Sequence, residues 1–400
     1  MYKITVVNIG SESNKGTAAI TLGTIRLLKK LFPESSITCI SLYDTLSGDT
    51  LLKHVFPEVK VVNNLRPLFT TGSQKILECL RVAIGAVPLP QHPAIEAIKE
   101  SDFVIARSSP LFRSRSKFFN YSAARASIPL FVAQRFGVPY GLAPQTFWPV
   151  NGLQAQSIIK NLYQKASFVM VRDIYSFNEL SKMGLEPILG LDHAFWIEPS
   201  DSRYYYMSRE MGLEDKKFVV VIPKSTGNIE LDKLLYKNIL IAISSVRQDE
   251  DQKILLVQHN LVEDTGAIKT FWEMGMKSFD NKILVLDCTE QTPEDLAGIY
   301  QHARLVISMR LHGVIMSLLV GTPVLGLDTD GRILAVLKTL GLYNCIARIY
   351  EDEKCLRERI RQVECYDFEL IRRYIEYRRV LDEINLRELI MKGLGQRREL

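Results

Sequence analysis

Arg310 and His312 are the residues whose types and spacing best suit chemistry on an anionic substrate. They stand in a turn between a predicted strand, Leu305–Ser308, and a predicted helix that starts near Gly313. The free N–H groups and the dipole at the amino end of a helix attract anions, and an arginine adds two parallel donors for carboxylate or phosphate. A histidine can move a proton near neutral pH. The turn predicts an anion site with a proton-transfer group, and the alternative is that His312 only caps the helix while Arg310 pairs with an acid across the cleft.

A second candidate follows the first predicted strand, Lys3–Ile9, where small residues would let the backbone approach a ligand and a lysine adds charge. Its residues are Asn14, Lys15, Gly16 and Thr17. The order of residues matches neither the P-loop nor the dinucleotide-binding glycine motif. An ordinary strand–helix turn is the alternative.

Arg172 ends another predicted strand and would point toward the mouth of a cleft, with Asp173 or Ser176 capping the next helix. A structural Arg172–Asp173 pair is the alternative. The loop 107–117 carries four cations and no acid, including Arg113 and Arg115. It could attract a phosphorylated acceptor, or it could be a solvated basic loop.

Two further candidates lie at strand ends in the second half of the chain. Lys224 follows Phe218–Ile222 and His259 follows Ile254–Gln258, so both would stand at the height of a ligand. The pair Asp192-His193 has no third ligand at a suitable spacing, and we predict no metal site.

The elements that must position these residues alternate between short β-branched runs and helices, which predicts parallel α/β sheets. The pattern breaks in a polar, tyrosine-rich stretch, Pro199–Lys217. We therefore expect two Rossmann-like domains, residues 1–200 and 201–400, facing a cleft into which the carboxyl ends of the strands point. The tail, Leu370–Leu394, reads as a basic amphipathic helix with apolar residues on roughly one side, namely Ile371, Tyr374, Ile375, Leu381 and Ile384. We expect it to pack over the domain junction in preference to a membrane.

Composition and net charge exclude some classes of function. The chain has 400 residues, 47% of them hydrophobic, and a net charge of +5. That mild charge suits anionic small molecules better than nucleic acid. The six cysteines show no zinc spacing, and no apolar run is long enough for a membrane span. A cytoplasmic protein is expected.

Taken in order, four of these segments resemble the polysaccharide pyruvyl transferase family. They are Asn14–Ala19, Arg172–Ser176, Asp192–Phe195 and Arg310–Pro323. The resemblance spans about residues 1–345 and implies a GT-B-like fold. It also implies transfer of a pyruvyl group from phosphoenolpyruvate to two hydroxyls of a glycan or lipid-linked sugar, which gives a ketal.

On this resemblance, Arg310, Arg332 and Arg172 would bind phosphoenolpyruvate, and His312 would handle the proton. Phosphoenolpyruvate would be a co-substrate with no other cofactor, and the protein could contact the membrane peripherally. Three departures bear on the acceptor. Arg332 stands where the family commonly has a lysine, Thr17 where it has an acid, and 107–109 where it has glycines.

Two other functions stay open. A nucleotide-sugar glycosyltransferase on the same scaffold would need an acid for the donor ribose, and Asp328 or Asp330 could serve. A non-catalytic relative would keep the fold alone. The sequence does not indicate the acceptor sugar, the ketal stereochemistry or the oligomeric state.

Overall fold

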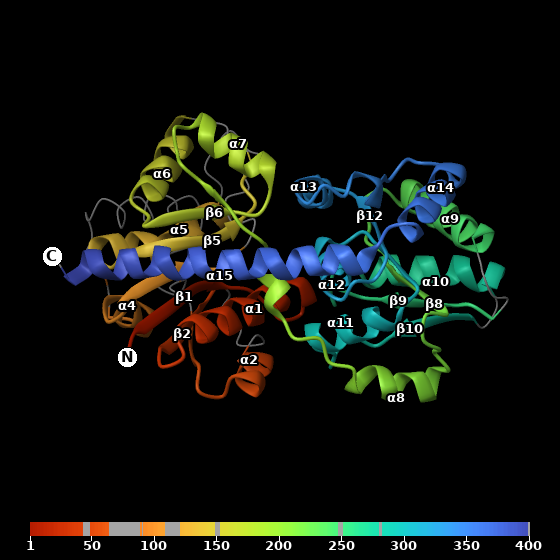
Figure 1. Cartoon of the computed structure of the whole chain (residues 1–400), viewed down its shortest axis with the longest axis horizontal. Helices are drawn as coiled ribbons and strands as arrows, with labels where there is room; N and C mark the ends of the chain where they lie inside the picture. The colour runs from red at the N-terminus through yellow and green to blue at the C-terminus, as the bar shows by residue number, and fades with distance from the viewer. Residues whose placement is uncertain are drawn as a thin grey trace. The chain divides into compact units, whose positions relative to one another are not determined.

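The computed structural model describes residues 1–42, 49–63, 89, 91–108, 121–148, 153–246, 251–279 and 282–398. They form two compact units. Unit 1 consists of Met1–Glu12, Ile20–Trp196 and Arg379–Leu400, and unit 2 consists of Ser13–Ala19 and Ile197–Arg378. Each unit has its own parallel sheet, so each is described by itself (Figure 1).

Unit 1 is built on a seven-stranded sheet in the order β3-β2-β1-β4-β5-β6-β7. Its strands are β1 (Lys3–Ile9), β2 (Ser36–Ser41), β3 (Lys60–Val62), β4 (Phe103–Ala106), β5 (Tyr140–Gln145), β6 (Phe168–Val171) and β7 (Ile188–Leu189). Every pairing is parallel, and all residues of β4, β5 and β6 are buried. Such continuous apolar runs are typical of parallel strands covered on both faces.

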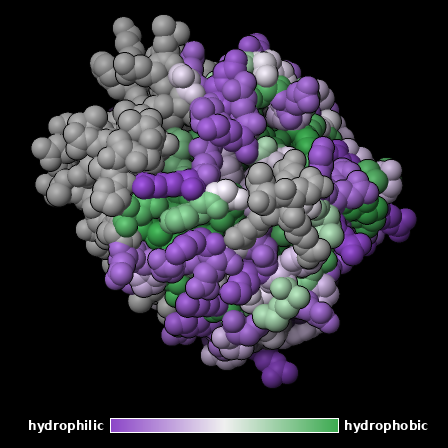
Figure 2. Space-filling model, turned by 90° about the vertical axis from the view of Figure 1, so that its left-hand side faces the viewer, coloured by the Kyte–Doolittle hydropathy of each residue, from purple (hydrophilic) through white to green (hydrophobic). Residues whose placement is uncertain are grey.

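Helices connect these strands. They are α1 (Lys15–Leu31), α2 (Asp49–Val55), α4 (Pro93–Lys99), α5 (Tyr121–Arg135), α6 (Leu153–Gln164), α7 (Ile174–Lys182) and the short 3₁₀ helix η3 (His193–Trp196). The core of this sheet includes Val104 and Val132, from β4 and α5. Figure 2 shows one face of the molecule, where hydrophilic side chains are spread widely and apolar residues lie in smaller areas between them.

Unit 2 has a six-stranded sheet in the order β10-β9-β8-β11-β12-β13, again with parallel pairings. Its strands are β8 (Phe218–Ile222), β9 (Lys253–Val257), β10 (Ile283–Leu286), β11 (Leu305–Ser308), β12 (Val324–Asp328) and β13 (Ile346–Arg348). Its helices are α8 (Ser202–Met211), α9 (Ile229–Ser245), α10 (Thr265–Phe279), α11 (Pro293–His302), α12 (Leu311–Leu319), α13 (Arg332–Thr339), η5 (Tyr343–Cys345) and α14 (Glu353–Glu364). The carboxyl ends of all its strands lie at one edge.

The last helix, α15 (Phe368–Arg398), is continuous and is drawn in blue in Figure 1. Its residues up to Arg378 belong to unit 2, and those from Arg379 belong to unit 1. Within the described ranges, no helix combines the length and the apolar run needed to cross a bilayer.

The two parallel α/β sheets confirm the predicted fold class. The stretch expected to be irregular, Pro199–Lys217, instead contains α8, which ends at Gly212 in a left-handed conformation (φ 57°). Only Tyr204 and Met207 of α8 are buried. One helical turn of apolar contact is too little for a periodic pattern to reveal the helix.

Candidate functional site

The candidate residues of unit 2 gather at the carboxyl edge of its sheet. The adjacent strands β9, β8, β11 and β12 run parallel, so the residues that follow them meet at one edge. Lys224 follows β8, His259 follows β9, Arg310 follows β11 and Arg332 follows β12. This is the edge at which open α/β sheets bind ligands.

The Arg310–His312 turn differs slightly from the predicted one. The helix α12 begins at Leu311, with Arg310 as its N-cap residue and with no cap hydrogen bond from its side chain. His312 therefore lies in the first turn of the helix, not ahead of it. The Oγ of Ser308 accepts from the Arg310 N–H at 3.1 Å and donates to the Arg310 carbonyl at 2.7 Å, which holds the turn on the end of β11.

Asp264 and Glu263 hold the side chain of Arg310. The Asp264 side chain is fully buried. Both of its oxygens lie 3.1 Å from Arg310 Nε, and one also accepts from Nη2. The Nη2 atom donates to Glu263 at 3.0 Å as well. Burial opposes the charged form, but the hydrogen bonds from Arg310 to Asp264 raise the pKa of Arg310 above its ordinary value. One edge of the guanidinium is thus already occupied, and Nη1 has no acceptor among the residues that the structure describes.

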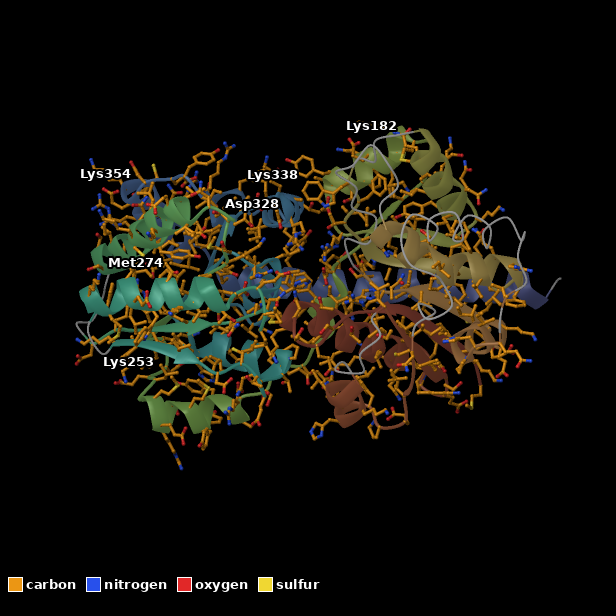
Figure 3. The ribbon with its side chains drawn as sticks, turned by 180° about the vertical axis from the view of Figure 1, so that it is seen from behind. Lys182, Lys253, Met274, Asp328, Lys338 and Lys354 are labelled. Atoms are coloured by element: carbon orange, nitrogen blue, oxygen red, sulfur yellow. The ribbon has the colours of Figure 1, made fainter. Side chains whose placement is uncertain are left out.

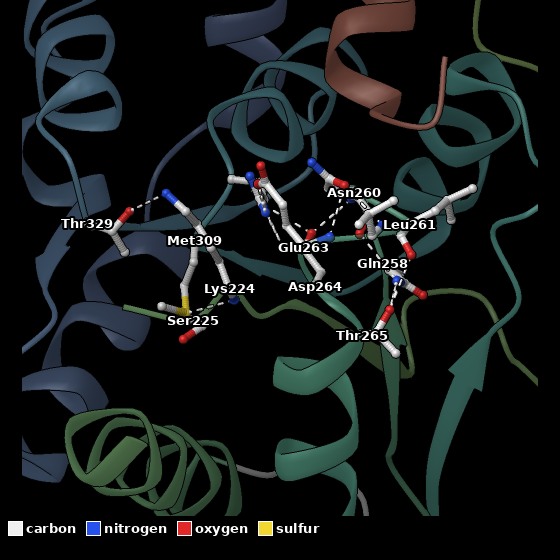
Figure 4. Close-up of polar contacts among 12 residues, drawn as sticks. Lys224, Ser225, Gln258, Asn260, Leu261, Glu263, Asp264, Thr265, Met309 and Thr329 are labelled. Atoms are coloured by element: carbon white, nitrogen blue, oxygen red, sulfur yellow. Dashed lines mark hydrogen bonds and ion pairs between the residues drawn. The ribbon is translucent and has the colours of Figure 1, made fainter. Parts of the chain in front are cut away.

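The sequence reading missed this role of Asp264. An acidic pair after β9, Glu263-Asp264, is the only signal that it carries. Arg310 does pair with an acid, but Asp264 belongs to the same unit as Arg310, whereas the alternative placed that acid across the cleft. Figure 4 shows Asp264 and Asn260 among these polar contacts, and the Asn260 N–H donates to Asp264 at 2.9 Å.

The segment Ser13–Ala19, a short loop followed by the first residues of α1, is part of unit 2. Asn14 forms an isolated antiparallel bridge with Asn260, and the Lys15 N–H donates to the His259 carbonyl at 2.8 Å. A Cβ atom on Gly16 would lie 2.1 Å from His312 Nδ1. The loop is thus packed directly against the Arg310–His312 turn.

The other residues of this loop have local and longer contacts. Asn14 Oδ1 accepts from the Thr17 N–H at 3.1 Å, at the start of α1. The Lys15 side chain is buried, with Nζ 3.4 Å from the Thr289 carbonyl. The structure therefore places Asn14, Lys15, Gly16 and Thr17 beside the candidate turn, although some 300 residues separate them from it in the chain.

His259 is buried beside the same loop. Its Nε2 lies 2.6 Å from the Tyr300 hydroxyl. Burial, followed by the positive charges of His312, Arg310 and Lys15, lowers the pKa of His259 well below its ordinary value. Its imidazole is neutral at neutral pH, so it cannot supply positive charge to an anion. His259 can still form a hydrogen bond, and its backbone carbonyl binds the Lys15 N–H.

Lys224, Asp330 and Arg332 form an ionic cluster at the end of β8 and β12. Lys224 Nζ lies 3.2 Å from Asp330 Oδ2 and 3.1 Å from Thr329 Oγ1, as Figure 4 shows in part. Arg332 makes two parallel hydrogen bonds to Asp330, at 2.9 and 2.7 Å. Burial lowers the pKa of Lys224, and the charges of Arg332 and Arg310 lower it further, against the opposing effect of Asp330. The charges of the turn and of this cluster are therefore close enough to act on one another.

Asp328, labelled in Figure 3, caps the helix that carries Arg332. Its carboxylate accepts from the N–H groups of Gly331 at 2.9 Å, Ile333 at 3.1 Å and Leu334 at 3.3 Å. The carboxylate oxygens are thus taken by the backbone of α13 and its N-cap.

Arg172 lies in unit 1 and is buried there. It forms an ion pair with Asp192, and its Nε donates to Thr146 Oγ1 at 2.7 Å. The Arg172–Asp173 pair considered above does not form. As predicted, Asp173 caps α7, accepting from the Ser176 N–H at 2.8 Å. The Nη2 atom of Arg172 is buried and lacks a partner among the described residues.

The remaining candidates can be placed briefly. Arg113 and Arg115 lie outside the described residues. The Nδ1 atom of His193 lies 2.9 Å from Thr24 Oγ1. In the part of the chain that the structure describes, no three metal-ligating side chains cluster.

A cavity of about 230 Å³ lies at the opposite edge of the unit 2 sheet. Its lining residues are Gly212, Glu214, Lys217, Phe218, Asp251, Lys253 and Lys282. The lysines that line the cavity already have ion-pair or hydrogen-bond partners. For example, Lys253 (labelled in Figure 3) donates to the Met211 and Gly212 carbonyls, both at 2.7 Å. The cavity is remote from the strand ends that carry the candidate residues, and it offers no comparable set of groups.

Solved structures of similar fold place this architecture in a known class. The UDP-GlcNAc 2-epimerase from Methanocaldococcus jannaschii is similar with a TM-score of 0.60 at 12% identity, over 94% of this chain and 99% of that chain. The UDP-GlcNAc 2-epimerase from Neisseria meningitidis has a TM-score of 0.58 at 13% identity, over 99% and 100%. A ugt transferase from Siraitia grosvenorii has a TM-score of 0.54 at 10% identity, over 97% and 99%. The protein therefore has the two-domain α/β fold of GT-B-like epimerases and glycosyltransferases.

The sequence decides the family within this class. Residues 14–331 match the family described as polysaccharide pyruvyl transferase, a range that includes the loop at Asn14, Arg172 and the Arg310–His312 turn. The chain belongs to the polysaccharide pyruvyl transferase family, as its motifs predicted. No curated protein shows significant sequence similarity to it.

Proposed function

We propose that this protein transfers the pyruvyl group of phosphoenolpyruvate onto two hydroxyls of a glycan sugar as a ketal, in the synthesis of a cell-surface polysaccharide. The observation that carries the proposal is the Arg310–His312 turn at the amino end of α12, with Lys15, Lys224 and Arg332 at the same sheet edge. Phosphoenolpyruvate has a carboxylate and a phosphate, so it needs several fixed donors and cations.

The proposed reaction starts at the methylene carbon of phosphoenolpyruvate. His312 gives a proton to this carbon, which becomes a methyl group and leaves C2 electrophilic. A sugar hydroxyl adds to C2 and returns its proton to the imidazole. The C2–O bond to phosphate then breaks, the second hydroxyl forms the other C2–O bond, and its proton leaves with the phosphate. The sum is a ketal and inorganic phosphate, without oxidation or reduction.

Electrostatic stabilisation of the departing phosphate is the larger part of this catalysis. The positive end of the helix dipole at the first turn of α12 suits an anion. Arg310 would contribute through Nη1, since Asp264 and Glu263 hold its other donors. Arg172 is proposed as a further ligand, with Asn14, Thr17 and His259 lining the substrate and Arg113 and Arg115 on the acceptor side.

The proposal extends to the setting of the reaction. Phosphoenolpyruvate is the co-substrate and no other cofactor takes part. The acceptor is a glycan or a lipid-linked sugar, met by a cytoplasmic protein that contacts the membrane peripherally. Nucleic acid is not a partner.

The arrangement of two acids disfavours the nucleotide-sugar alternative. A donor ribose would need Asp328 or Asp330, but Asp328 accepts three backbone N–H groups. Asp330 is held by Lys224 and Arg332, which outweigh the effect of burial and lower the pKa of Asp330. Binding ribose through either acid would require breaking these contacts.

The test is phosphate release from phosphoenolpyruvate in the presence of candidate glycan and lipid-linked acceptors. We expect His312→Ala to lower kcat by about 100-fold or more, and Arg310→Lys to lower kcat/KM by a similar factor while leaving a cation beside Asp264. The exposed residues His54 and Arg361 supply control variants, His54→Ala and Arg361→Ala, with unchanged rates. Wild-type turnover in both site variants would refute the proposal, and turnover of nucleotide sugars alone would favour the alternative.

A further inference from the structure

The helix α15 has apolar residues on two faces. One set is buried, and includes Phe368, Ile375, Leu386, Ile390 and Leu394. The sequence pattern grouped Ile375 with Ile371, Tyr374, Leu381 and Ile384 on roughly one side, and this grouping was wrong. Ile375 is buried, whereas Tyr374, Leu381 and Ile384 are exposed. The second set lies on a different face of the helix, and the packing of α15 does not account for it.

The exposed residues form one narrow stripe. They are Leu370, Tyr374, Tyr377, Leu381, Ile384 and Met391, with Val380 beside them. The first five are separated by four, three, four and three residues, the spacing that keeps side chains on one side of a helix. Leu370 is 62% exposed, Tyr377 60% and Ile384 52%. At 1.5 Å per residue the stripe is about 30 Å long.

Cations border this stripe on both sides. Arg373 and Arg387 lie along one border, and Arg378 and Lys392 lie along the other. Of these cations, Arg373 is paired with Glu369, at 3.3 Å from Nε to Oε1, and Glu388 is in line with the stripe. The cations along the stripe still outnumber these two acids. The stripe therefore suits a partner with an apolar interior and a negatively charged surface.

A second copy of the helix would be a poor partner for this stripe. In a parallel pair, the bordering positions would place Arg373 opposite Arg378, and Arg387 opposite Lys392, of the other copy. In an antiparallel pair, Arg373 would face Arg387. Like charges at such positions oppose helix pairing, so the charge pattern argues against self-association through this face.

We propose that the exposed stripe of α15 docks the protein onto the surface of a bilayer that contains anionic lipids. Apolar side chains on one face of a helix, bordered by arginine and lysine, are typical of helices that lie in the membrane interface. Tyr374 and Tyr377 suit the headgroup region, because tyrosine has an apolar ring and a polar hydroxyl. The cations would then contact the lipid phosphates. This inference concerns lipid contact alone and does not depend on the pyruvyl transfer reaction.

The experiment is co-sedimentation of the full chain with vesicles. We expect binding to vesicles of phosphatidylcholine mixed with phosphatidylglycerol, weaker binding as salt is raised, and little binding to phosphatidylcholine alone. Ile384→Asp and Leu381→Asp should each lower the partition coefficient about tenfold or more. Arg387→Gln and Lys392→Gln should each lower it about fivefold.

Leu234→Asp supplies the matched control. Leu234 is an exposed leucine of α9, on another helix of the protein, and the variant should bind vesicles as the wild type does. Because all these positions are exposed, thermal unfolding should be nearly unchanged. Absence of vesicle binding, equal binding to neutral and anionic vesicles, or a dimer that Ile384→Asp dissociates would each overturn the proposal. Phosphate release in solution reports separately on the proposed reaction.

Discussion

Gly16, the second residue of α1, is packed directly against His312 of the Arg310–His312 turn. A methyl group there would lie 2.1 Å from His312 Nδ1 and 2.5 Å from its Cγ, far inside contact distance, so His312 must move. We expect Gly16→Ala to lower kcat by about 100-fold, because a displacement of about 1 Å at a catalytic group has that effect. Kinetics of phosphate release measure this loss.

Gly266→Ala is the matched control for this variant. Gly16 and Gly266 both lie in unit 2, and each is the second residue of its helix, α1 and α10, but nothing lies within 4 Å of a Cβ atom at Gly266. The control should keep full activity and equal or slightly higher stability, since alanine is the better helix former. Equal activity of the two variants would show that the position of His312 is not critical.

Residue types and spacing identified the candidate turn but not the groups around it. A strand, a turn with Arg310 and His312, and a helix can be recognised in one short segment of sequence. The partnership of Arg310 with Asp264 joins residues 46 positions apart, and a single sequence carries no signal for it. In the same way, the position of His259 after a strand predicted that it faces a ligand. That position does not predict that the imidazole forms a hydrogen bond with the Tyr300 hydroxyl.

At the scale of the element, helix capping links stability to the site. Asp328 caps α13 from the end of β12, and α13 begins with Arg332. We expect Asp328→Ala to lower the free energy of unfolding by about 1–2 kcal/mol. We also expect it to raise the KM for phosphoenolpyruvate, because the first turn of α13, which carries Arg332, is no longer held by the Asp328 carboxylate. Urea denaturation and phosphate release measure the two effects.

Thr292→Ala separates these effects. Thr292 caps α11 in the same unit, with Asp295 completing a capping box, and neither residue contacts the candidate groups through a hydrogen bond. This variant should lose a similar free energy of unfolding, about 1 kcal/mol, with unchanged KM. A raised KM in both variants would mean that lost stability, and not the position of Arg332, explains the effect of Asp328→Ala.

Elements with a long buried face were predicted well, and the others were not. The strands β8 and β11 are fully buried, and their apolar runs predicted them. α8, with two buried residues, has no such pattern. The apolar residues of α15 were predicted, but not which of its two faces is buried, because that depends on what the rest of the chain places beside it.

At the scale of the whole molecule, the order of the chain does not follow the division into units. The segment Ser13–Ala19, which includes the first residues of α1, belongs to unit 2, and the chain from Arg379 belongs to unit 1. The contacts of this segment with His259 and Asn260 connect segments about 245 residues apart. Hydrophobic periodicity describes neighbours along the chain, so it predicted two α/β sheets but could not predict which unit each short segment joins.

Each unit also contains a buried histidine that is neutral in the folded protein. His259 in unit 2 has a pKa well below its ordinary value, through burial and then neighbouring positive charge. In unit 1, burial lowers the pKa of His193 from 6.5 to about 4, against the opposing charge of Asp192. Thr24 donates to the Ile20 carbonyl at 2.7 Å, so it accepts from His193 Nδ1, and protonating the ring requires a new partner for Nε2.

Acid should therefore destabilise both units. Between pH 6.5 and about 4 the unfolded chain binds a proton at His193 that the folded chain does not, so this contribution is complete above pH 6.5 and is lost as the pH falls. For His193 alone the loss is about 3 kcal/mol, measurable by urea denaturation across this range. His193→Asn, which retains a donor for Thr24 but cannot be protonated, should lower stability at pH 7 and flatten the dependence of stability on pH. A variant with the same slope as the wild type would show that His193 is not the group responsible.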